Sequence, residues 1–304
     1  MVSGIIVVDK PQGITSHNVV SRLRGILSER RIGHGGTLDP LATGVLPIFV
    51  GRATRASSYL LNSDKSYAAS FKLGISTDTQ DITGIIQSKS DKLPSEGELT
   101  DVLGKFIGKL QQTPPMYSAI KVGGKKLYEL ARSGIEVERE ARDIEIYSIE
   151  VLEEGCKPSE GVYTIWVSCS KGTYIRTLVH DIGQLLGCGA VLTALRRTST
   201  GPFDLNMART LEEIEQARSA GTVDSIIVPV DTLFSEYPQF QLDESGERLC
   251  RNGAKIPLPS TGTQFQVNDL YRVYGPEGNF LMIGKIVHHN GREFLKTVKS
   301  FFEV

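Results

Sequence analysis

The sequence GHGGTLDPLATGVLP occupies residues 33–47 and places one carboxylate, Asp39, in a loop of small residues and proline. His34 lies five positions upstream of this carboxylate, and four glycines fall within twelve residues. Glycine allows positive φ and a close approach of the backbone to a ligand, while proline stiffens the loop. Because ordering glycine costs more entropy than ordering any other residue, this composition indicates a built site. The simplest alternative is an ordinary glycine-rich turn in which Asp39 is an Asx-cap residue.

The length and composition are typical of a folded chain. The 304 residues predict one large domain or two domains, and a hydrophobic content of 40% supports a sizeable packed core. The four cysteines form no CxxC pair and have no histidine at metal-ligand spacing, so we expect buried thiols in a reducing compartment and no metal site. No apolar run reaches the roughly 18 residues of a membrane-spanning helix. We therefore expect a soluble, cytoplasmic protein without membrane association.

Charge is unevenly distributed along the chain, although the formal net charge is −1. Residues 1–60 carry seven Lys/Arg against three acids, a net of +4. Residues 205–247 carry two Arg against nine acids, a net of −7, and residues 248–304 carry eight Lys/Arg against four acids, again +4. Two basic regions around an acidic one suit a protein that grips a polyanion at two places, and ordinary solvated charge is the alternative.

Hydrophobic periodicity predicts alternating strands and helices over the first two thirds of the chain. Ser16 is expected to cap an amphipathic helix that runs to about residue 29, and further helices are expected at 52–61 and 174–186. The predicted strands are 4–8, 45–50, 66–73, 143–152, 163–170 and 190–198. Because several strands follow each other directly, we expect an α+β domain with a mixed, mainly antiparallel sheet and not a doubly wound one.

Residues 114–142 differ in character from the regular elements around them. They hold Gly123-Gly124, then Lys125 and Lys126, then an amphipathic piece at 127–132, with six basic residues against four acids. Glycine hinges beside lysines are typical of a mobile loop that folds onto a phosphate backbone. A solvent-exposed helix–turn insertion is the alternative.

The tail from residue 238 has a pattern of its own. The stretch Leu249–Pro257 precedes short β-rich runs at 270–274, 280–287 and 294–299. This pattern resembles a PUA domain, a small RNA-binding β-barrel, and the basic excess of the tail fits that resemblance. A plain small barrel is the alternative, because NG turns between strands are common in any β domain.

Several motifs resemble, in the same order along the chain, those of the TruB family of RNA pseudouridine synthases. They are the Asp39 loop, Lys65-Ser66-Tyr67, Asp78–Gly84, Ser170–Thr177 and Leu192–Thr198. The resemblance covers roughly residues 4–235 and is weaker beyond them. It implies a pseudouridine synthase catalytic domain in residues 1–237, with 114–142 as an RNA-binding thumb insertion, followed by a PUA-like domain in 238–304.

The resemblance also implies the chemistry of the site. Pseudouridine forms when the C1′–N1 bond of a uridine breaks, the base turns, and C1′ joins C5. There is no redox change and no net hydrolysis, so no cofactor and no metal are demanded. Within twenty residues of Asp39 the only other acid is Glu29, which favours single-carboxylate chemistry over the carboxylate pair of a retaining glycosidase. Asp39 can attack C1′ or stabilise positive charge there, take a C2′ proton, or add to the base.

The remaining site residues are assigned by the same resemblance. An ionised carboxylate in a closed pocket needs a partner cation, and Arg176 can hold Asp39 in a bidentate geometry. Tyr67 is implied to stack on the target uracil and to help remove the C5 proton. His34 is similar to the histidine that fills the stack when the target nucleotide flips out. The other expected substrate contacts are Tyr174, Leu195, Lys10, Gly36, Thr37, Lys125 and Lys126. Core packing is the alternative for the two tyrosines and Leu195, and a hydrogen-bonded loop residue is the alternative for His34.

The expected function is therefore that of a tRNA pseudouridine synthase acting on the uridine at position 55 in the T loop. The C-terminal domain is expected to hold the acceptor end, and no protein partner is expected. One alternative is the catalytic subunit of a guide-RNA-directed pseudouridylase, whose relatives usually carry basic extensions that this chain lacks at both ends. Another is an RNA-binding or RNA-folding protein without turnover, against which the set of Asp39, Tyr67 and Arg176 argues.

Overall fold

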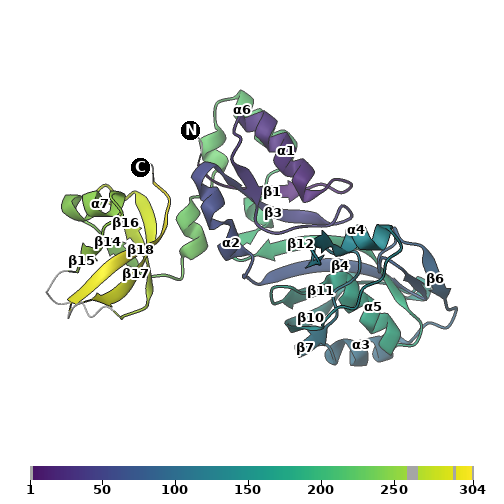
Figure 1. Cartoon of the computed structure of the whole chain (residues 1–304). Coiled ribbons are helices and arrows are strands. Elements are labelled where there is room, and N and C mark those ends of the chain that lie inside the picture. The colour runs from purple at the N-terminus through teal and green to yellow at the C-terminus, as the bar shows by residue number, and fades with distance from the viewer. Residues whose placement is uncertain (1–2, 259–265, 290–291, 303–304) are drawn as a thin grey trace.

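The computed structural model describes residues 3–258, 266–289 and 292–302. Figure 1 shows a larger lobe built on a long curved sheet and a smaller lobe that contains the C-terminal strands. No helix within the described ranges has the length and apolar character of a membrane span.

A nine-stranded sheet organises the larger lobe. Its path is β1-β3-β12-β4-β11-β10-β7, with β2 attached to β3 and β13 attached to β12. Every pairing is antiparallel except that of β3 with β12. This arrangement confirms the predicted α+β architecture with a mixed, mainly antiparallel sheet. The strands are β1 (Gly4–Lys10), β2 (Ile32–His34), β3 (Thr43–Val50), β4 (Lys65–Leu73), β7 (Gly108–Gln112), β10 (Arg142–Lys157), β11 (Val162–Cys169), β12 (Ala190–Thr200) and β13 (Phe203–Asp204).

Helices contribute to a single hydrophobic cluster on one face of this sheet. They are α1 (Ser16–Leu27), α3 (Glu96–Gly104), α5 (Ile175–Leu185) and α6 (Leu211–Ser219). Strand residues Ile6 and Val8 belong to the same cluster, whereas Ile5 and Val7 belong to a second one. This division follows from the alternation of side chains along a strand. The predicted helix at 174–186 is confirmed as α5.

Two sequence predictions about helices need correction. Thr15, and not Ser16, caps α1, since the Thr15 hydroxyl accepts a hydrogen bond of 3.0 Å from the backbone N of Asn18. Both residues carry a hydroxyl, but the side chain of Ser16 turns inward to the loop that follows β2. The predicted helix at 52–61 is a 3₁₀ segment, η1 (Gly51–Ala56), followed by one turn of α-helix, α2 (Ser57–Leu60). Neither piece has a side-chain cap, as suits a short, tight connection.

The segment 114–142 holds a short hairpin and a short helix. The hairpin pairs β8 (Lys121–Val122) with β9 (Lys125–Lys126), and α4 (Leu127–Arg132) follows directly. Gly123 and Gly124 form its turn with φ of 59° and 84°, a conformation that favours glycine.

The C-terminal lobe is a curled five-stranded sheet with the order β14-β16-β17-β18-β15. Its strands are β14 (Gln239–Gln241), β15 (Ile256–Pro257), β16 (Leu270–Tyr274), β17 (Phe280–His289) and β18 (Arg292–Ser300), and α7 (Glu244–Arg251) lies between β14 and β15. The three predicted tail strands are confirmed as β16, β17 and β18. The described strands form an open path, so closure into a barrel stays a prediction.

An aromatic cluster joins the two lobes. Phe234 lies 5.0 Å from Tyr59 in the larger lobe, and 6.2 and 5.9 Å from Phe280 and Phe301 in the smaller one, measured between ring centroids. Arg55 donates a hydrogen bond of 3.1 Å from Nη1 to the carbonyl of Ser300. The C-terminal sheet therefore shares buried apolar surface with the larger lobe and packs directly against it.

Candidate active site

The loop that carries Asp39 runs between β2 and β3 and is held at its centre and where it enters β3. Near its centre, the Ser16 hydroxyl donates to the carbonyl of Leu38 at 3.1 Å and accepts from the backbone N of Leu38 at 2.9 Å. Gly44 has φ of 96°, and a Cβ there would meet the Arg197 carbonyl oxygen at 2.2 Å. The glycine is required because the loop returns to the sheet directly against the backbone of β12.

Lys10 binds the backbone of the same loop from the protein interior. Its ammonium donates to the carbonyl of Ala42 at 2.6 Å and to that of Pro11 at 3.1 Å, and the side chain is fully buried. Burial lowers the pKa of Lys10 to about 8, while the charge of Asp39 opposes that shift. Lys10 thus contacts the loop backbone from the interior, and its described hydrogen bonds leave it no exposed face toward a substrate.

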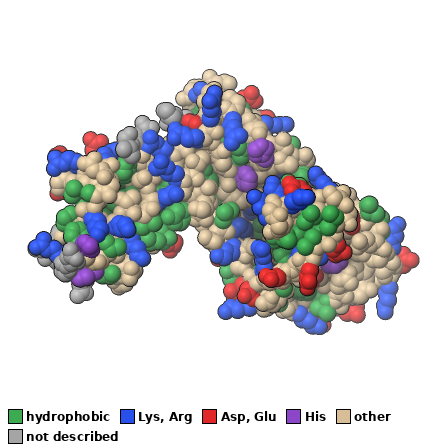
Figure 2. Space-filling view, in the orientation of Figure 1, with side chains coloured by type: hydrophobic (Ala, Val, Ile, Leu, Met, Phe, Trp, Pro, Cys, Tyr) green, Lys and Arg blue, Asp and Glu red, His purple; other side chains and the backbone are tan. Residues whose placement is uncertain are grey.

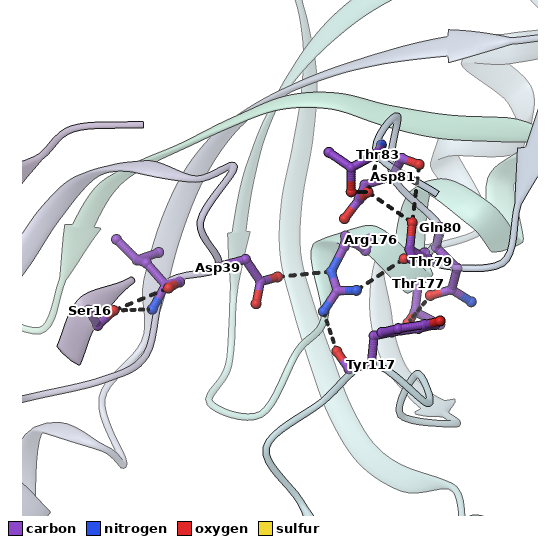
Figure 3. Close-up of polar contacts among 10 residues, drawn as sticks. Ser16, Asp39, Thr79, Gln80, Asp81, Thr83, Tyr117, Arg176 and Thr177 are labelled. Carbon is purple, nitrogen blue, oxygen red and sulfur yellow. Dashed lines mark hydrogen bonds and ion pairs between the residues drawn. The ribbon is translucent and has the colours of Figure 1, made fainter. Parts of the chain in front are cut away.

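Asp39 and Arg176 form the ion pair at the centre of the site (Figure 3). Arg176 Nε lies 2.9 Å from Asp39 Oδ2, with side-chain exposures of 6% for the arginine and 42% for the aspartate. The arginine is thereby buried behind a carboxylate that is open to a ligand. This contact uses one nitrogen and is not the expected bidentate fork, because the two terminal nitrogens bind elsewhere.

Two backbone carbonyls fix the guanidinium of Arg176. Nη1 donates to the Thr79 carbonyl at 3.0 Å, and Nη2 donates to the Tyr117 carbonyl at 2.7 Å. Thr79 precedes a turn in which Asp81 Oδ1 accepts bonds from Thr83 N and Thr79 Oγ1 at 3.0 and 2.9 Å. Figure 3 shows these groups converging on Arg176 from different parts of the chain. The arginine therefore couples the Asp39 loop to this turn and to the start of the 114–142 insertion.

A pocket opens beside the ion pair. Its lining residues are Asp39, Leu41, Ala42, Asp81, Arg176, Leu192 and Leu195. Leu195 is 9% exposed and comes from β12. Four of these lining residues are apolar, and the Asp39 carboxylate lies among them together with Asp81 and Arg176.

Tyr67 lies on β4 with 7% exposure. Burial raises the pKa of its phenol, and the charge and hydrogen bonding of Arg197 oppose that rise. The charge of Asp39 raises the same pKa, which places Tyr67 within electrostatic reach of the central carboxylate. Tyr174 is half-buried at the N-cap of α5, where its backbone N donates to Gln112 Oε1 at 2.8 Å.

The other sequence-predicted residues lie at two places. His34 ends β2 and is half-buried, with a buried Nδ1 that has no hydrogen-bond partner in the described structure. Gly36 is buried and Thr37 is exposed in the Asp39 loop. Lys125 and Lys126 lie on the hairpin of the insertion, where Lys126 Nζ is 5.4 Å from the centre of the Tyr128 ring. No described contact joins these two lysines to Asp39.

Sequence reasoning missed Thr79, Tyr117 and Arg197. The first two act through backbone carbonyls, which leave no side-chain pattern to read. Arg197 did carry a signal, because it is a charged residue inside a strand that is otherwise mostly buried. In the residues that the structure describes, no group of three His, Cys, Asp or Glu side chains is placed to hold a metal ion.

Two family models match consecutive stretches of the larger lobe. The N-terminal domain model of the TruB family pseudouridylate synthases matches residues 24–175, and the C-terminal domain model of tRNA pseudouridylate synthase B matches residues 176–235. Together they span the Asp39 loop, the insertion and α5.

Curated relatives and solved structures agree with the family models. The tRNA pseudouridine synthase B of Bacillus pumilus is 40% identical over 98% of this chain and 97% of its own, and that of Geobacter sulfurreducens is 47% identical over 82% and 81%. The crystal structure of a Cbf5-Nop10-Gar1 complex contains a chain with a TM-score of 0.74 at 28% identity, covering 98% of this chain and 85% of that one. A second similar chain, with a TM-score of 0.73 at 26% identity, comes from an H/ACA RNP bound to a substrate RNA containing 2'-deoxyuridine and covers 99% of this chain and 85% of that one. With family models over residues 24–235 and a relative at 40% identity over nearly its full length, the chain belongs to the TruB family of pseudouridylate synthases.

Proposed function

We propose that the protein is a tRNA pseudouridine synthase that converts the uridine at position 55 of the T loop to pseudouridine. The single observation that carries this proposal is the half-exposed Asp39 carboxylate, held by the buried Arg176 at 2.9 Å beside an apolar pocket. The names of the curated relatives support tRNA as the substrate. An isomerisation needs no electron acceptor and no net water, so no cofactor is proposed.

Asp39 is proposed as the catalytic carboxylate. It acts by attack on C1′, by stabilising positive charge there, by taking the C2′ proton, or by adding to the base. In each route the C1′–N1 bond breaks and the C1′–C5 bond forms. Arg176 orients the carboxylate through the ion pair at 2.9 Å. Tyr67 stacks on the uracil and takes the proton that C5 must lose.

The proposed substrate contacts follow the positions of the residues. Leu195, which lines the pocket, and Tyr174, at the start of α5, are proposed to flank the base. His34 is proposed to replace the flipped nucleotide in the RNA stack. Gly36 and Thr37 approach the nucleotide through the loop, which Lys10 holds in place through the carbonyl of Ala42. Lys125 and Lys126 bind phosphates from the insertion.

The proposed domain division assigns residues 1–237 to catalysis, with 114–142 as a thumb, and residues 238–304 to a PUA-like domain. Figure 2 shows Lys and Arg side chains on both lobes, as expected for a tRNA held at two places. The proposed location is the cytoplasm, where tRNA is modified.

A guide-RNA-directed pseudouridylase is the second candidate, because the similar solved structures include Cbf5-Nop10-Gar1 and H/ACA RNP complexes. Release of tritium from tRNA labelled at C5 of uridine, with purified protein and no guide RNA, separates the two. Near-stoichiometric release from unmodified tRNA, abolished when uridine 55 is changed to cytidine, supports the proposal. No release without a guide favours the second candidate, and no release in any condition favours an RNA-binding protein without turnover.

A further inference from the structure

Arg197 is a buried cation beside the proposed active site. Its side chain is 1% exposed on β12, and among the described residues no carboxylate forms an ion pair with it. Nε donates to the Val45 carbonyl at 2.7 Å and Nη2 to the Gly36 carbonyl at 3.4 Å. Burying a guanidinium without a carboxylate is costly, and neutral donors would satisfy two carbonyls equally well. The charge itself therefore needs an explanation.

The group that gains from this charge is Tyr67. The two residues lie directly opposite each other in the antiparallel pair of β4 and β12, so their side chains share one face of the sheet. Both are buried. Burial is the largest influence on both groups: it raises the pKa of Tyr67 and lowers the pKa of Arg197. The charge and hydrogen bonding of Arg197 oppose the rise at Tyr67, and Tyr67 in turn opposes the fall at Arg197.

The other charged and titratable neighbours fall into two groups. Some raise the pKa of Tyr67, and the others are cations whose charged forms Arg197 destabilises. Cys169 on β11 and Asp39 in the loop both raise the pKa of Tyr67. On the cationic side, Arg197 lowers the pKa of Lys10, His34 and Lys65, so its field disfavours their charged forms. Arg197 is the cation that offsets burial for the phenol.

The proposed chemistry requires such a cation. A neutral phenol that accepted the C5 proton would become an oxonium ion, whereas a phenolate becomes an ordinary phenol. We propose that Arg197 is a positioning residue whose buried guanidinium stabilises the phenolate of Tyr67, so that this oxygen can take the C5 proton. The phenol proton leaves to water before the reaction, and the proton taken from C5 leaves to water after product release. This inference rests on the proposed function.

The wild-type protein without RNA provides the first test. Tyrosine labelled with ¹³C at Cζ reports each phenol's ionisation by NMR, and the Tyr67 signal is the one of ten that disappears in Tyr67→Phe. Tyr163 is the internal control, because it is 4% exposed in the same cluster and its pKa is raised by burial and by the charges of Glu96 and Cys156. In the part of the chain that the structure describes, no cation opposes that rise. We expect Tyr67 to titrate at a lower pH than Tyr163. Titration of Tyr67 at or above the pH of Tyr163 overturns the inference even if no variant folds.

The second test removes the charge. Arg197→Gln keeps N–H donors for the two carbonyls, and Arg197→Lys keeps the charge. We expect the pKa of Tyr67 to rise by about one unit or more in the glutamine variant, a tenfold change in its ionisation equilibrium. In the lysine variant, we expect this pKa to lie close to its wild-type value. Arg196→Gln is the matched control, since Arg196 pairs with Asp9 at 2.7 Å and should leave the pKa of Tyr67 unchanged. Equal shifts in the Arg196 and Arg197 variants contradict the inference.

The third test measures single-turnover rates against pH on unmodified tRNA. In folded Arg197→Gln, the rising limb of the rate should move to higher pH by the same interval as the Tyr67 pKa, with tRNA affinity within about threefold of wild type. Adding Arg197→Gln to Tyr67→Phe should cost little more, because the arginine acts through the phenol. A loss that is constant across pH and additive with Tyr67→Phe shows a purely structural role. If the wild-type protein is inactive on tRNA, the proposed function is rejected. The NMR titration is made without RNA, so it tests the Arg197–Tyr67 inference independently of turnover.

Discussion

Arg176 Nε lies 2.9 Å from Asp39 Oδ2, and the arginine is buried where the aspartate is open. The carbonyls of Thr79 and Tyr117 accept hydrogen bonds from the two terminal nitrogens of Arg176. These bonds fix the position of the guanidinium independently of Asp39. A charge-assisted contact of this kind orients the carboxylate while one oxygen stays available to a substrate. The site is thus preorganised by three separate segments that meet at one arginine.

Asp39→Asn should abolish turnover while it preserves RNA binding. The amide keeps the size of the side chain and removes the charge that each proposed route needs. We expect tritium release below detection and a tRNA affinity within about tenfold of wild type, or 1.4 kcal/mol. Asp91→Asn, at an exposed turn residue, is the charge-matched control. Turnover near wild type in pure Asp39→Asn would exclude Asp39 as the catalytic residue.

Arg176→Lys should be far from conservative. One ammonium cannot reach Asp39 and both carbonyls in the geometry that the planar guanidinium provides. Loss of these charge-assisted bonds predicts a single-turnover rate at least about a hundredfold lower. Arg22→Lys, on the exposed side of α1, is the matched control. An Arg176→Lys enzyme with near-normal rate would mean that only the positive charge matters.

Tyr67→Phe separates stacking from proton transfer. The ring and its burial are retained, and only the hydroxyl is lost. Binding should survive, and turnover should fall by at least about a hundredfold, the scale of general acid–base catalysis. The rate is measured in a single turnover, with affinity from filter binding. If the phenylalanine enzyme is nearly fully active, Tyr67 serves only as a stacking surface and another group takes the proton.

The parts of the fold that local sequence determines were predictable, and the parts that depend on distant contacts were not. Alternation identified β4, β10 and β11, and the helix prediction located α5 to within a residue at each end. The order of the sheet was not predictable, because the parallel contact of β3 with β12 joins Thr43 to Arg196. The length of the Asp39 motif revealed the central carboxylate.

The environment of that carboxylate was harder to predict for the same physical reason. A guanidinium bound to the carbonyl of Tyr117 leaves no trace in the identity of residue 117. The expected bidentate pair was wrong because the terminal nitrogens of Arg176 serve these carbonyls. The family resemblance made Lys10 an expected substrate contact, whereas its burial became visible only with the loop packed on it.

Lys10 predicts a pH-dependent contribution to stability. Its pKa is lowered by burial from 10.5 to about 8, so between those values the unfolded chain binds more protons than the folded one. The lysine's contribution to the free energy of unfolding should therefore rise from about pH 8 towards pH 10.5. Urea unfolding of wild type and Lys10→Met at several pH values measures this, because the difference cancels other titrating groups. A difference that is flat or falls over that interval contradicts the burial of a lowered-pKa lysine.

Basic residues of the C-terminal lobe should bind the acceptor arm of tRNA. Exposed Lys255 and Lys296 are neighbours, since Ile256 of β15 pairs with Leu295 of β18, and exposed Arg292 begins the same strand β18. Changing all three to glutamine should weaken binding of full-length tRNA and flatten its salt dependence, because each lost phosphate contact lowers the slope by about one. An isolated T-arm stem-loop, which is too short to reach this lobe, should be much less affected.

Point substitutions are preferable to removal of residues 238–304 for this test. Phe280 and Phe301 pack on Phe234, so truncation would expose the cluster that joins the lobes and would destabilise the remainder. The control changes the exposed residues Lys89, Lys105 and Lys109. They lie in β6 (Ile86–Lys89), directly after α3 and in β7, and Figure 1 shows these elements on the side of the larger lobe away from the C-terminal lobe. This control removes the same charge and should leave the difference between the two RNAs intact. Equal losses on tRNA and stem-loop for the C-terminal variant, with folding unchanged, would show that this surface does not read the acceptor arm.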